Sequence, residues 1–229
     1  MLLRIRVRLP DRPGSLGKVA RILGVAGANV AQMTVLERDN GRALDDFTVA
    51  WSAGAGIDRL LEGLASVPGV DIVGIWPTEE PQGAYPDAAL IGQLAADPER
   101  GAVTLADAVS ALLSADWAVL AEPAPDGGGK PALVHVSVGG LGELILPPLE
   151  PLRARAFTAE DGTQYALCPI EAAPGSGLVL VVARTGAPPF HRTEVLRLAE
   201  LVGAAEAVLG TRRSSGADGA TEAYLVRNT

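Results

Sequence analysis

The sequence is poor in the side chains that bind metals and form disulfides. Its 229 residues include one cysteine, Cys168, and two histidines, His135 and His191. A single cysteine excludes an internal disulfide framework. A zinc site needs three or four His, Cys or carboxylate ligands at suitable spacing, and the sequence shows no such cluster. We therefore expect neither a metal ion nor another cofactor.

Positive charge is also in short supply. The chain has 19 Lys and Arg residues against 27 Asp and Glu residues, which gives a formal net charge of -8 at pH 7. Domains that bind nucleic acid usually show a basic patch or stripe. The charge balance therefore predicts that nucleic acid is not a partner.

Long apolar runs are missing as well. No stretch approaches the roughly 20 apolar residues that span a bilayer. Residues 1–10 alternate arginine with apolar residues instead of forming the apolar block of a signal peptide. We expect a cytoplasmic protein with no membrane partner. Hydrophobic residues still make up 48% of the chain, enough for a packed core in one large or two ordinary domains.

The first 76 residues predict four strands and two helices. The elements are a strand at 2–9, a helix from Ser15 that ends at Gly24 to Gly27, a strand at 29–38, a return strand that ends at Trp51, a helix at 57–64 and a strand at 70–76. Asn40-Gly41, between the two middle strands, is a strong hairpin signal. This β-α-β-β-α-β order predicts a ferredoxin-like α+β domain with both helices on one face of an antiparallel sheet.

The second half predicts another antiparallel sheet. Its expected helices are 88–95, 104–113 and 193–209, and its expected strands are 117–121, 132–138, 142–146, 164–170 and 178–184. Helices at both ends of a run of strands indicate a sheet with its helices on one side. The residues from Gly210 onward are polar and predict a flexible tail, in which "AYLVR" offers a possible edge strand.

Two segments of the first half resemble a known family. "DRPGSLGKVARIL", residues 11–23, and "GANV", residues 27–30, are similar to the ACT domain family within the same β-α-β-β-α-β order. ACT domains are small regulatory modules that commonly bind amino acids and pair through their sheets or helices. The resemblance implies that Gly14 marks a ligand-competent loop and that Asn29 faces the ligand.

Two segments of the second half carry another resemblance. "YALCPIEAAPGSGLVLVVAR" and "PPFHRTEVLRLAELVGAAEAVL", residues 165–184 and 188–209, are similar to the GAF domain family. GAF domains form a sensor fold for cyclic nucleotides and other small molecules. Together the two resemblances imply an ACT-like regulatory domain, a linker, a GAF-like sensor domain and a tail, at residues 1–77, 78–86, 87–210 and 211–229.

The corner between the first strand and the first helix predicts an anion site. A helix N-terminus carries unpaired N–H groups and partial positive charge, which suit a carboxylate. Gly14 has no Cβ, so a ligand can approach the amides of Gly14, Ser15 and Leu16, while Pro13 fixes the corner. The predicted site therefore accepts the carboxylate of an α-amino acid.

Two further residues suit the ammonium group of such a ligand. Asp11 can accept a hydrogen bond from it, and Asn29 offers both a donor and an acceptor. An ordinary structural reading stays open: Asp-Arg-Pro-Gly is normal turn chemistry, Ser15 can cap the helix, and Asn29 can belong to the helix stop after Gly27.

The second half offers few groups for chemistry. His135 lies on a predicted strand, where a histidine is usually a sheet residue, although the GAF resemblance allows it to face that domain's pocket. Cys168 precedes Pro169 in an apolar strand and is expected to be a buried, inert thiol. We assign no catalytic residue and expect that the protein is not an enzyme.

These observations predict a small-molecule-binding regulatory protein. An edge or open face of a four-stranded sheet needs cover, so we expect a homodimer, and a signal leaves through dimer packing or through a separate protein partner. Two alternatives remain open at this point. One is a structural or interaction module with non-functional pockets. The other is an enzyme whose site lies in the second domain, which requires His135, Cys168 or acidic residues to converge there.

Overall fold

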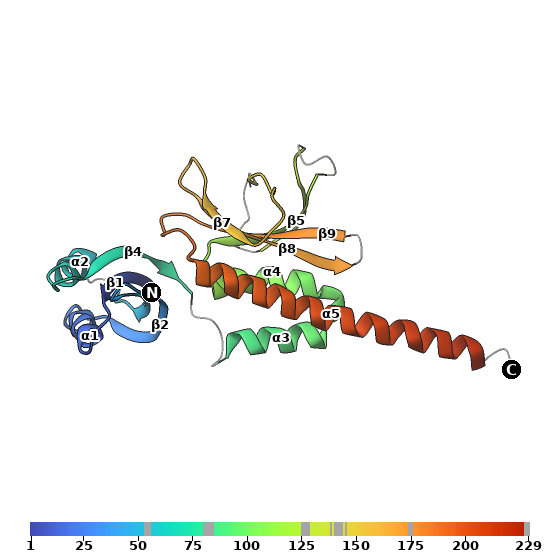
Figure 1. Ribbon diagram of the computed structural model, residues 1–229, viewed down its shortest axis with the longest axis horizontal. Coiled ribbons are helices and arrows are strands. Elements are labelled where there is room, and N and C mark those ends of the chain that lie inside the picture. The colour runs from blue at the N-terminus through green and yellow to red at the C-terminus, as the bar shows by residue number, and fades with distance from the viewer. Residues whose placement is uncertain are drawn as a thin grey trace. The chain divides into compact units, whose positions relative to one another are not determined.

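The structure is a computed structural model that describes residues 1–52, 56–79, 85–124, 129–137, 139, 144, 146–173 and 176–226, with backbone alone at 171–173, 176 and 211–226. The chain forms two compact units. Unit 1 comprises Met1–Glu80 and Gly186–Thr193, and unit 2 comprises Pro81–Thr185 and Glu194–Thr229. Each unit has its own antiparallel sheet, of four strands in unit 1 and five in unit 2 (Figure 1). The predicted mixed α+β class is confirmed.

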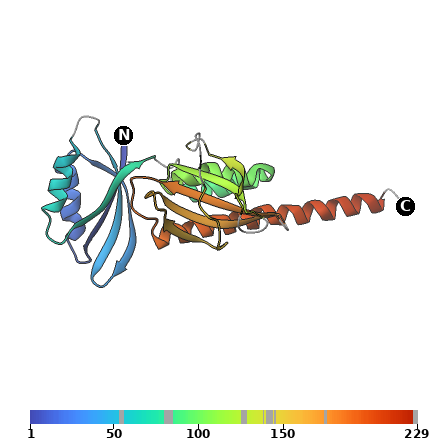
Figure 2. The ribbon, with the colours of Figure 1, turned by 90° about the horizontal axis from the view of Figure 1, so that it is seen from above.

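Unit 1 has the predicted ferredoxin-like arrangement. Its elements are β1 (Leu2–Pro10), α1 (Ser15–Val25), β2 (Asn29–Asp39), β3 (Arg42–Ala50), α2 (Ile57–Ala65) and β4 (Asp71–Thr78). The strand order is β2-β3-β1-β4, and every described neighbouring pair is antiparallel. Both helices cover the same face of the sheet in Figure 1 and Figure 2.

The sequence pattern explains why these elements form. The apolar residues of β1 are buried together with Val19 and Leu23 of α1 and Leu60 and Leu64 of α2. Asn40 and Gly41 both have positive φ angles, 49° and 73°, in the turn between β2 and β3, as a two-residue hairpin requires. The core of unit 1 therefore lies between the sheet and its two helices.

The other face of this sheet is covered by the protein's own chain. Arg6 is 2% exposed there and donates to both carboxylate oxygens of Asp46, at 2.7 and 2.8 Å. Its remaining nitrogen, Nη1, donates to the carbonyl oxygen of Pro189 at 3.3 Å. Gly74 of β4 leaves room for Pro188, whose Cγ would lie 2.4 Å from a Cβ at that position. The sequence predicts an open face that needs cover, and segment 186–193 of the same chain supplies part of that cover.

Unit 2 contains a longer sheet and its own helices. Its elements are α3 (Pro86–Ala96), the short 3₁₀ helix η1 (Pro98–Arg100), α4 (Gly101–Leu112), β5 (Trp117–Glu122), β6 (Ala132–Val136), β7 (Arg155–Thr158), β8 (Gln164–Ala173), β9 (Ser176–Arg184) and α5 (Arg192–Val226). The strand order is β6-β5-β9-β8-β7. Helix α4 contacts β5, β6 and β9, and α3 packs on α4. The helices thus lie on one side of the sheet, as predicted (Figure 1).

Unit 2 differs from the prediction in two places. Strand β7 is only four residues long and has no counterpart in the prediction. Helix α5 continues to Val226, where the sequence predicts a flexible tail and a possible edge strand, and no proline interrupts it after Arg192. Most of the strand predicted at 142–146 falls outside the described residues. In the ranges that the structure describes, no helix is long and apolar enough to cross a membrane.

A buried ion pair joins β9 to the start of α5. Arg184 is 1% exposed and donates to both carboxylate oxygens of Glu194, at 2.9 and 3.1 Å. Arg184 also donates to the carbonyl oxygen of Leu113 at 3.1 Å. Both charged groups are removed from water. Loss of either partner would leave an unpaired buried charge and lower the free energy of unfolding.

Candidate functional site

The corner between β1 and α1 is built by backbone hydrogen bonds. The amide of Asp11 donates to the carbonyl of Gly41 at 2.8 Å, and the amide of Arg12 donates to that of Pro10 at 3.0 Å. Gly14 is the N-cap residue of α1, with φ 85° and ψ -12°. Residues that carry a Cβ rarely adopt this left-handed backbone conformation, so the corner favours glycine at position 14.

Part of the N-terminus of α1 has no hydrogen-bond partner among the residues that the structure describes. In the described ranges, no acceptor receives a hydrogen bond from the amides of Gly14, Leu16 and Gly17. The amide of Ser15 differs from the prediction, because it donates to the carbonyl of Arg12 at 3.2 Å. Ser15 also makes no side-chain cap, which removes the capping role that the sequence left open. Two of the three predicted amide donors are therefore available.

A hollow of about 360 Å³ lies against this corner. It is lined by residues 9–16, by Met33, Val35 and Arg38 of β2, and by Ala43 and Asp45 of β3. Five of the predicted site residues line it: Asp11, Pro13, Gly14, Ser15 and Leu16. The side chains of Leu16, Met33 and Val35 are 40%, 37% and 36% exposed, so the hollow has an accessible apolar wall.

Asn29 is not part of this hollow. It pairs with Ala50, which pairs in turn with Leu2 at the start of β1. The corner follows Pro10, at the other end of that strand. Eight residue steps at about 3.3 Å each separate the two ends by roughly 26 Å. One ligand in the hollow therefore cannot also reach Asn29 of the same chain.

Asp11 lies at the rim of the hollow. Its carboxylate forms a long ion pair with Arg38, at 3.9 Å between Nε and Oδ1, and the two side chains are 40% and 65% exposed. Exposed pairs of this kind are screened by water and contribute little, about 0–1 kcal/mol. Asp11 remains hydrated and does not need a ligand to satisfy it.

Asp45 is the residue that sequence reasoning missed. It is only 3% exposed, and its Oδ1 has no hydrogen-bond partner among the described residues. Burial raises the pKa of its carboxyl group above the usual 3.8, the Arg38 charge opposes this, and the carboxylates of Asp11 and Asp46 add to it. A signal was present in the sequence: Asp45 has the same parity along β3 as the buried Phe47, so alternation places it on the apolar face.

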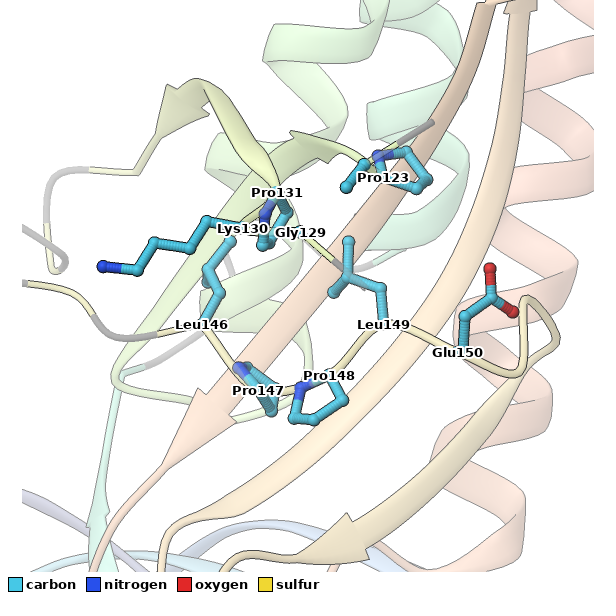
Figure 3. Close-up of a pocket in the computed structure, with 10 residues that line it drawn as sticks. Pro123, Gly129, Lys130, Pro131, Leu146, Pro147, Pro148, Leu149 and Glu150 are labelled. Carbon is cyan, nitrogen blue, oxygen red and sulfur yellow. The ribbon is translucent and has the colours of Figure 1, made fainter. Parts of the chain in front are cut away.

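A second pocket, of about 240 Å³, lies in unit 2 on loops beside the sheet. Its described lining is Pro123, Ala124, Gly129, Lys130, Pro131 and the run from Leu146 to Glu150. Figure 3 shows the amino end of Lys130 and the carboxylate of Glu150 directed away from the apolar lining. Arg155 fixes one wall by donating to the carbonyls of Pro148, Leu149 and Glu150, at 3.0, 3.3 and 2.9 Å.

His135 is not among the residues that line this pocket. Its Nε2 lies 2.7 Å from Oδ1 of Asp107 on α4, so the imidazole faces the helical layer. His135 pairs with Leu120 of β5, and neighbouring residues on paired strands share a face of the sheet. His135 therefore does not line this pocket, and its place in the pocket that the GAF resemblance suggests stays a prediction.

Cys168 and His135 do not converge. Cys168 lies on β8 and His135 on β6, and strands β5 and β9 separate them. Three interstrand steps amount to about 14 Å. Burial raises the pKa of the Cys168 thiol to about 11, with a smaller contribution from the Glu206 carboxylate. Cys168 and His135 therefore do not form a nucleophile and base pair, whereas His135 and the acidic residue Asp107 do approach each other.

Comparisons with known proteins add likenesses in shape only. No protein-family model and no curated protein matches the sequence. Among solved structures, 14 chains match. A formyltetrahydrofolate deformylase from Pseudomonas putida KT2440 is 15% identical, with 42% of this chain and 39% of that chain covered and a TM-score of 0.31.

Two other solved structures show likenesses of the same kind. GqqA, a quorum quenching acylase, is 22% identical, with 34% of this chain and 42% of that chain covered and a TM-score of 0.27. A protein of unknown function from Galdieria sulphuraria is 14% identical over 90% of both chains, with a TM-score of 0.31. This chain thus spans less than half of the deformylase and of the acylase. All three TM-scores lie below 0.5, so the activities of these proteins are not carried over.

Proposed function

We propose that the protein is a regulatory protein that binds a small molecule, with an amino acid as the ligand class and the corner hollow of unit 1 as the sensing site. The observation that carries this proposal is the hollow itself, in which amides of α1 that have no partner among the described residues lie beside an accessible apolar wall. The resemblance of residues 11–23 and 27–30 to ACT domains supports the same ligand class.

The amides of Gly14 and Leu16 suit the ligand's carboxylate. Both residues line the hollow, and α1 carries no acidic side chain in its first turn that would compete with an anion. A negative charge at a helix N-terminus is favoured by about 0.3–1 kcal/mol at an exposed site. The apolar side chains of Met33 and Val35 then provide contacts for an apolar ligand side chain.

In this proposal, ligand binding changes the association of two copies of the chain, and this change is the signal. Strand β2 is an edge of the sheet, and its residues Val30, Met33 and Val35 are exposed apolar side chains. A second copy that covers this edge forms the expected homodimer. Since Met33 and Val35 also line the hollow, the ligand and the dimer contact share side chains, and coupling of about 1–3 kcal/mol is typical of such an arrangement.

The test is thermal unfolding of the full chain against each of the twenty amino acids, with two matched variants. Met33→Trp fills the hollow with an aromatic side chain at an exposed strand position. Gln32→Trp places the same ring on the neighbouring residue, which pairs with Thr48 and points to the other face. At least one amino acid should raise the unfolding temperature of the wild type and of Gln32→Trp but not of Met33→Trp. If none of the twenty raises the unfolding temperature of the wild type, the proposal is wrong.

A protein-interaction module is the second candidate, and the exposed apolar edge of β2 is the observation that favours it. In that case the chain forms the same dimer, or binds a separate protein partner, without responding to small molecules. Mass by size-exclusion chromatography with light scattering, repeated with and without the amino acids, distinguishes the two functions. If the protein is a dimer and no amino acid changes its mass or its thermal stability, the result supports the interaction module.

A further inference from the structure

We infer that Asp45 binds the protonated amine of the ligand in the corner hollow, so that the site selects zwitterionic amino acids over carboxylic acids that lack the amine. This inference rests on the proposed function, because it assigns a role within the same site. Neither Asp11 nor Asn29, the two residues that the sequence suggests for the ammonium group, has this role.

The burial of Asp45 carries the inference. The residue is 3% exposed, lines the hollow, and keeps an oxygen atom, Oδ1, without a partner among the described residues. Most buried polar side chains are hydrogen-bonded, and a carboxylate removed from water without a partner is costly. Exceptions to this rule are expected at functional sites, where a ligand can supply the missing hydrogen-bond partner.

The shape of the site favours an amine over other cations. A metal ion needs several ligands, and the part of the chain that the structure describes contains no group of three or more His, Cys, Asp or Glu side chains suited to one. Asp45 is the buried carboxylate of the lining, and a buried carboxylate beside apolar side chains fits a monovalent group with several donors, which an ammonium group is. Arg38 lines the hollow and its charge acts on Asp45, but its side chain is 65% exposed and extends to Asp11, and Oδ1 of Asp45 keeps no hydrogen-bond partner among the described residues.

Besides the exposed charged side chains at its rim, the hollow is lined by groups of opposite polarity. The amides of Gly14 and Leu16 offer partial positive charge, and Asp45 offers a negative charge. An α-amino acid presents the complementary pair on a single carbon atom. Leu16, Met33 and Val35 border the same space and favour an apolar side chain on that carbon.

The experiment compares amino acids with their deamino analogues by isothermal titration calorimetry on the full chain. The probes are L-leucine with 4-methylpentanoate, and L-valine with 3-methylbutanoate. A hydrogen bond to a charged group implies that the wild type binds the amino acid about 10- to 100-fold more tightly than its analogue. In Asp45→Asn this ratio should fall close to one, because the variant keeps the size of the side chain and removes its charge.

Two control variants keep the ratio if the inference is correct. Asp11→Asn removes the exposed carboxylate at the rim, and Asn29→Ala removes the amide at the far end of β2. If Asp45→Asn keeps the ratio, or if Asp11→Asn abolishes it, the inference is wrong while the proposed function survives. If the wild type binds no amino acid at all, the proposed function fails and the inference fails with it.

A measurement on the wild type covers the case in which Asp45→Asn does not fold. The carboxyl ¹³C signal of Asp45 is followed by NMR as a function of pH, with and without L-leucine. An ammonium group beside the carboxylate should lower the midpoint of this titration, and 4-methylpentanoate should not. An identical midpoint with saturating L-leucine and without it overturns the inference.

Discussion

Replacing Asp45 by Asn should stabilise the protein when no ligand is present. Asp45 is 3% exposed and its Oδ1 has no partner among the described residues, so the folded state contains a buried, unpaired acceptor. A group of this kind costs about 1–3 kcal/mol, and more when it is charged. Asn retains one oxygen atom and loses the charge. We therefore expect a gain of about 1 kcal/mol at neutral pH, or about 2–4 °C in Tm for a chain of this size.

The direction of the pH dependence follows from the raised pKa. Burial raises the pKa of Asp45 above 3.8, so the folded protein holds this proton more tightly than the unfolded chain does. The contribution of Asp45 to stability is therefore largest below pH 3.8 and falls as the pH rises through the raised pKa. The advantage of Asp45→Asn should be small near pH 4 and reach its full size above the raised pKa.

The assay is thermal unfolding without ligand, followed by tryptophan fluorescence at several pH values between 4 and 8. Trp51 and Trp76 are both buried in unit 1 and report on the unit that contains Asp45. Met33→Ala is the comparison variant, because it alters the lining of the same hollow but does not change the number of charges. A loss of stability in Asp45→Asn at pH 7, or a difference from wild type that does not vary with pH, would refute the reasoning about Asp45.

Three further predictions concern buried groups and close packing in the two units. Glu194→Ala leaves Arg184 buried without its carboxylate and should lower the free energy of unfolding by about 3–5 kcal/mol in urea titrations. Gly74→Ala places a Cβ 2.4 Å from Cγ of Pro188, and such overpacking costs about 1–3 kcal/mol, so faster proteolysis of segment 186–193 is expected. Cys168, with its pKa raised to about 11, should react with a thiol reagent at pH 7 only when the protein is denatured.

Much of the fold of unit 1 is predictable because its signals are local. Alternation through β1 and the Asn40-Gly41 turn each act within a few residues, and the structure follows them closely. Strand β7 and the extension of α5 lack such signals. A strand of four residues is too short for a clear alternation, and the polar composition after Gly210 is compatible with a helix as well as with a tail.

The candidate site depends on pairing between segments that are distant in the chain. The sequence therefore predicts only the corner residues, which are adjacent to one another in the chain. The corner residues are adjacent in the chain, and the structure keeps them together around the hollow. The position of Asn29 depends on the register between β2 and β3, which includes two irregularities that no local pattern reveals. The amide of Ser15 is taken by a carbonyl three residues earlier, a detail of turn geometry.

Ligand binding and self-association should be one linked equilibrium in this protein. Met33 and Val35 line the hollow and are also exposed on the edge strand β2, so a second copy that covers this edge changes the surroundings of the ligand. Linkage requires that if dimerisation tightens ligand binding by some factor, the ligand strengthens the dimer by the same factor. The charge of Asp45 enters the ligand-binding term, because at neutral pH its cost falls when an amine is bound. Under the proposed function, Met33 and Val35 would therefore couple the association of two chains to the ligand, and Asp45 would decide which ligands bind.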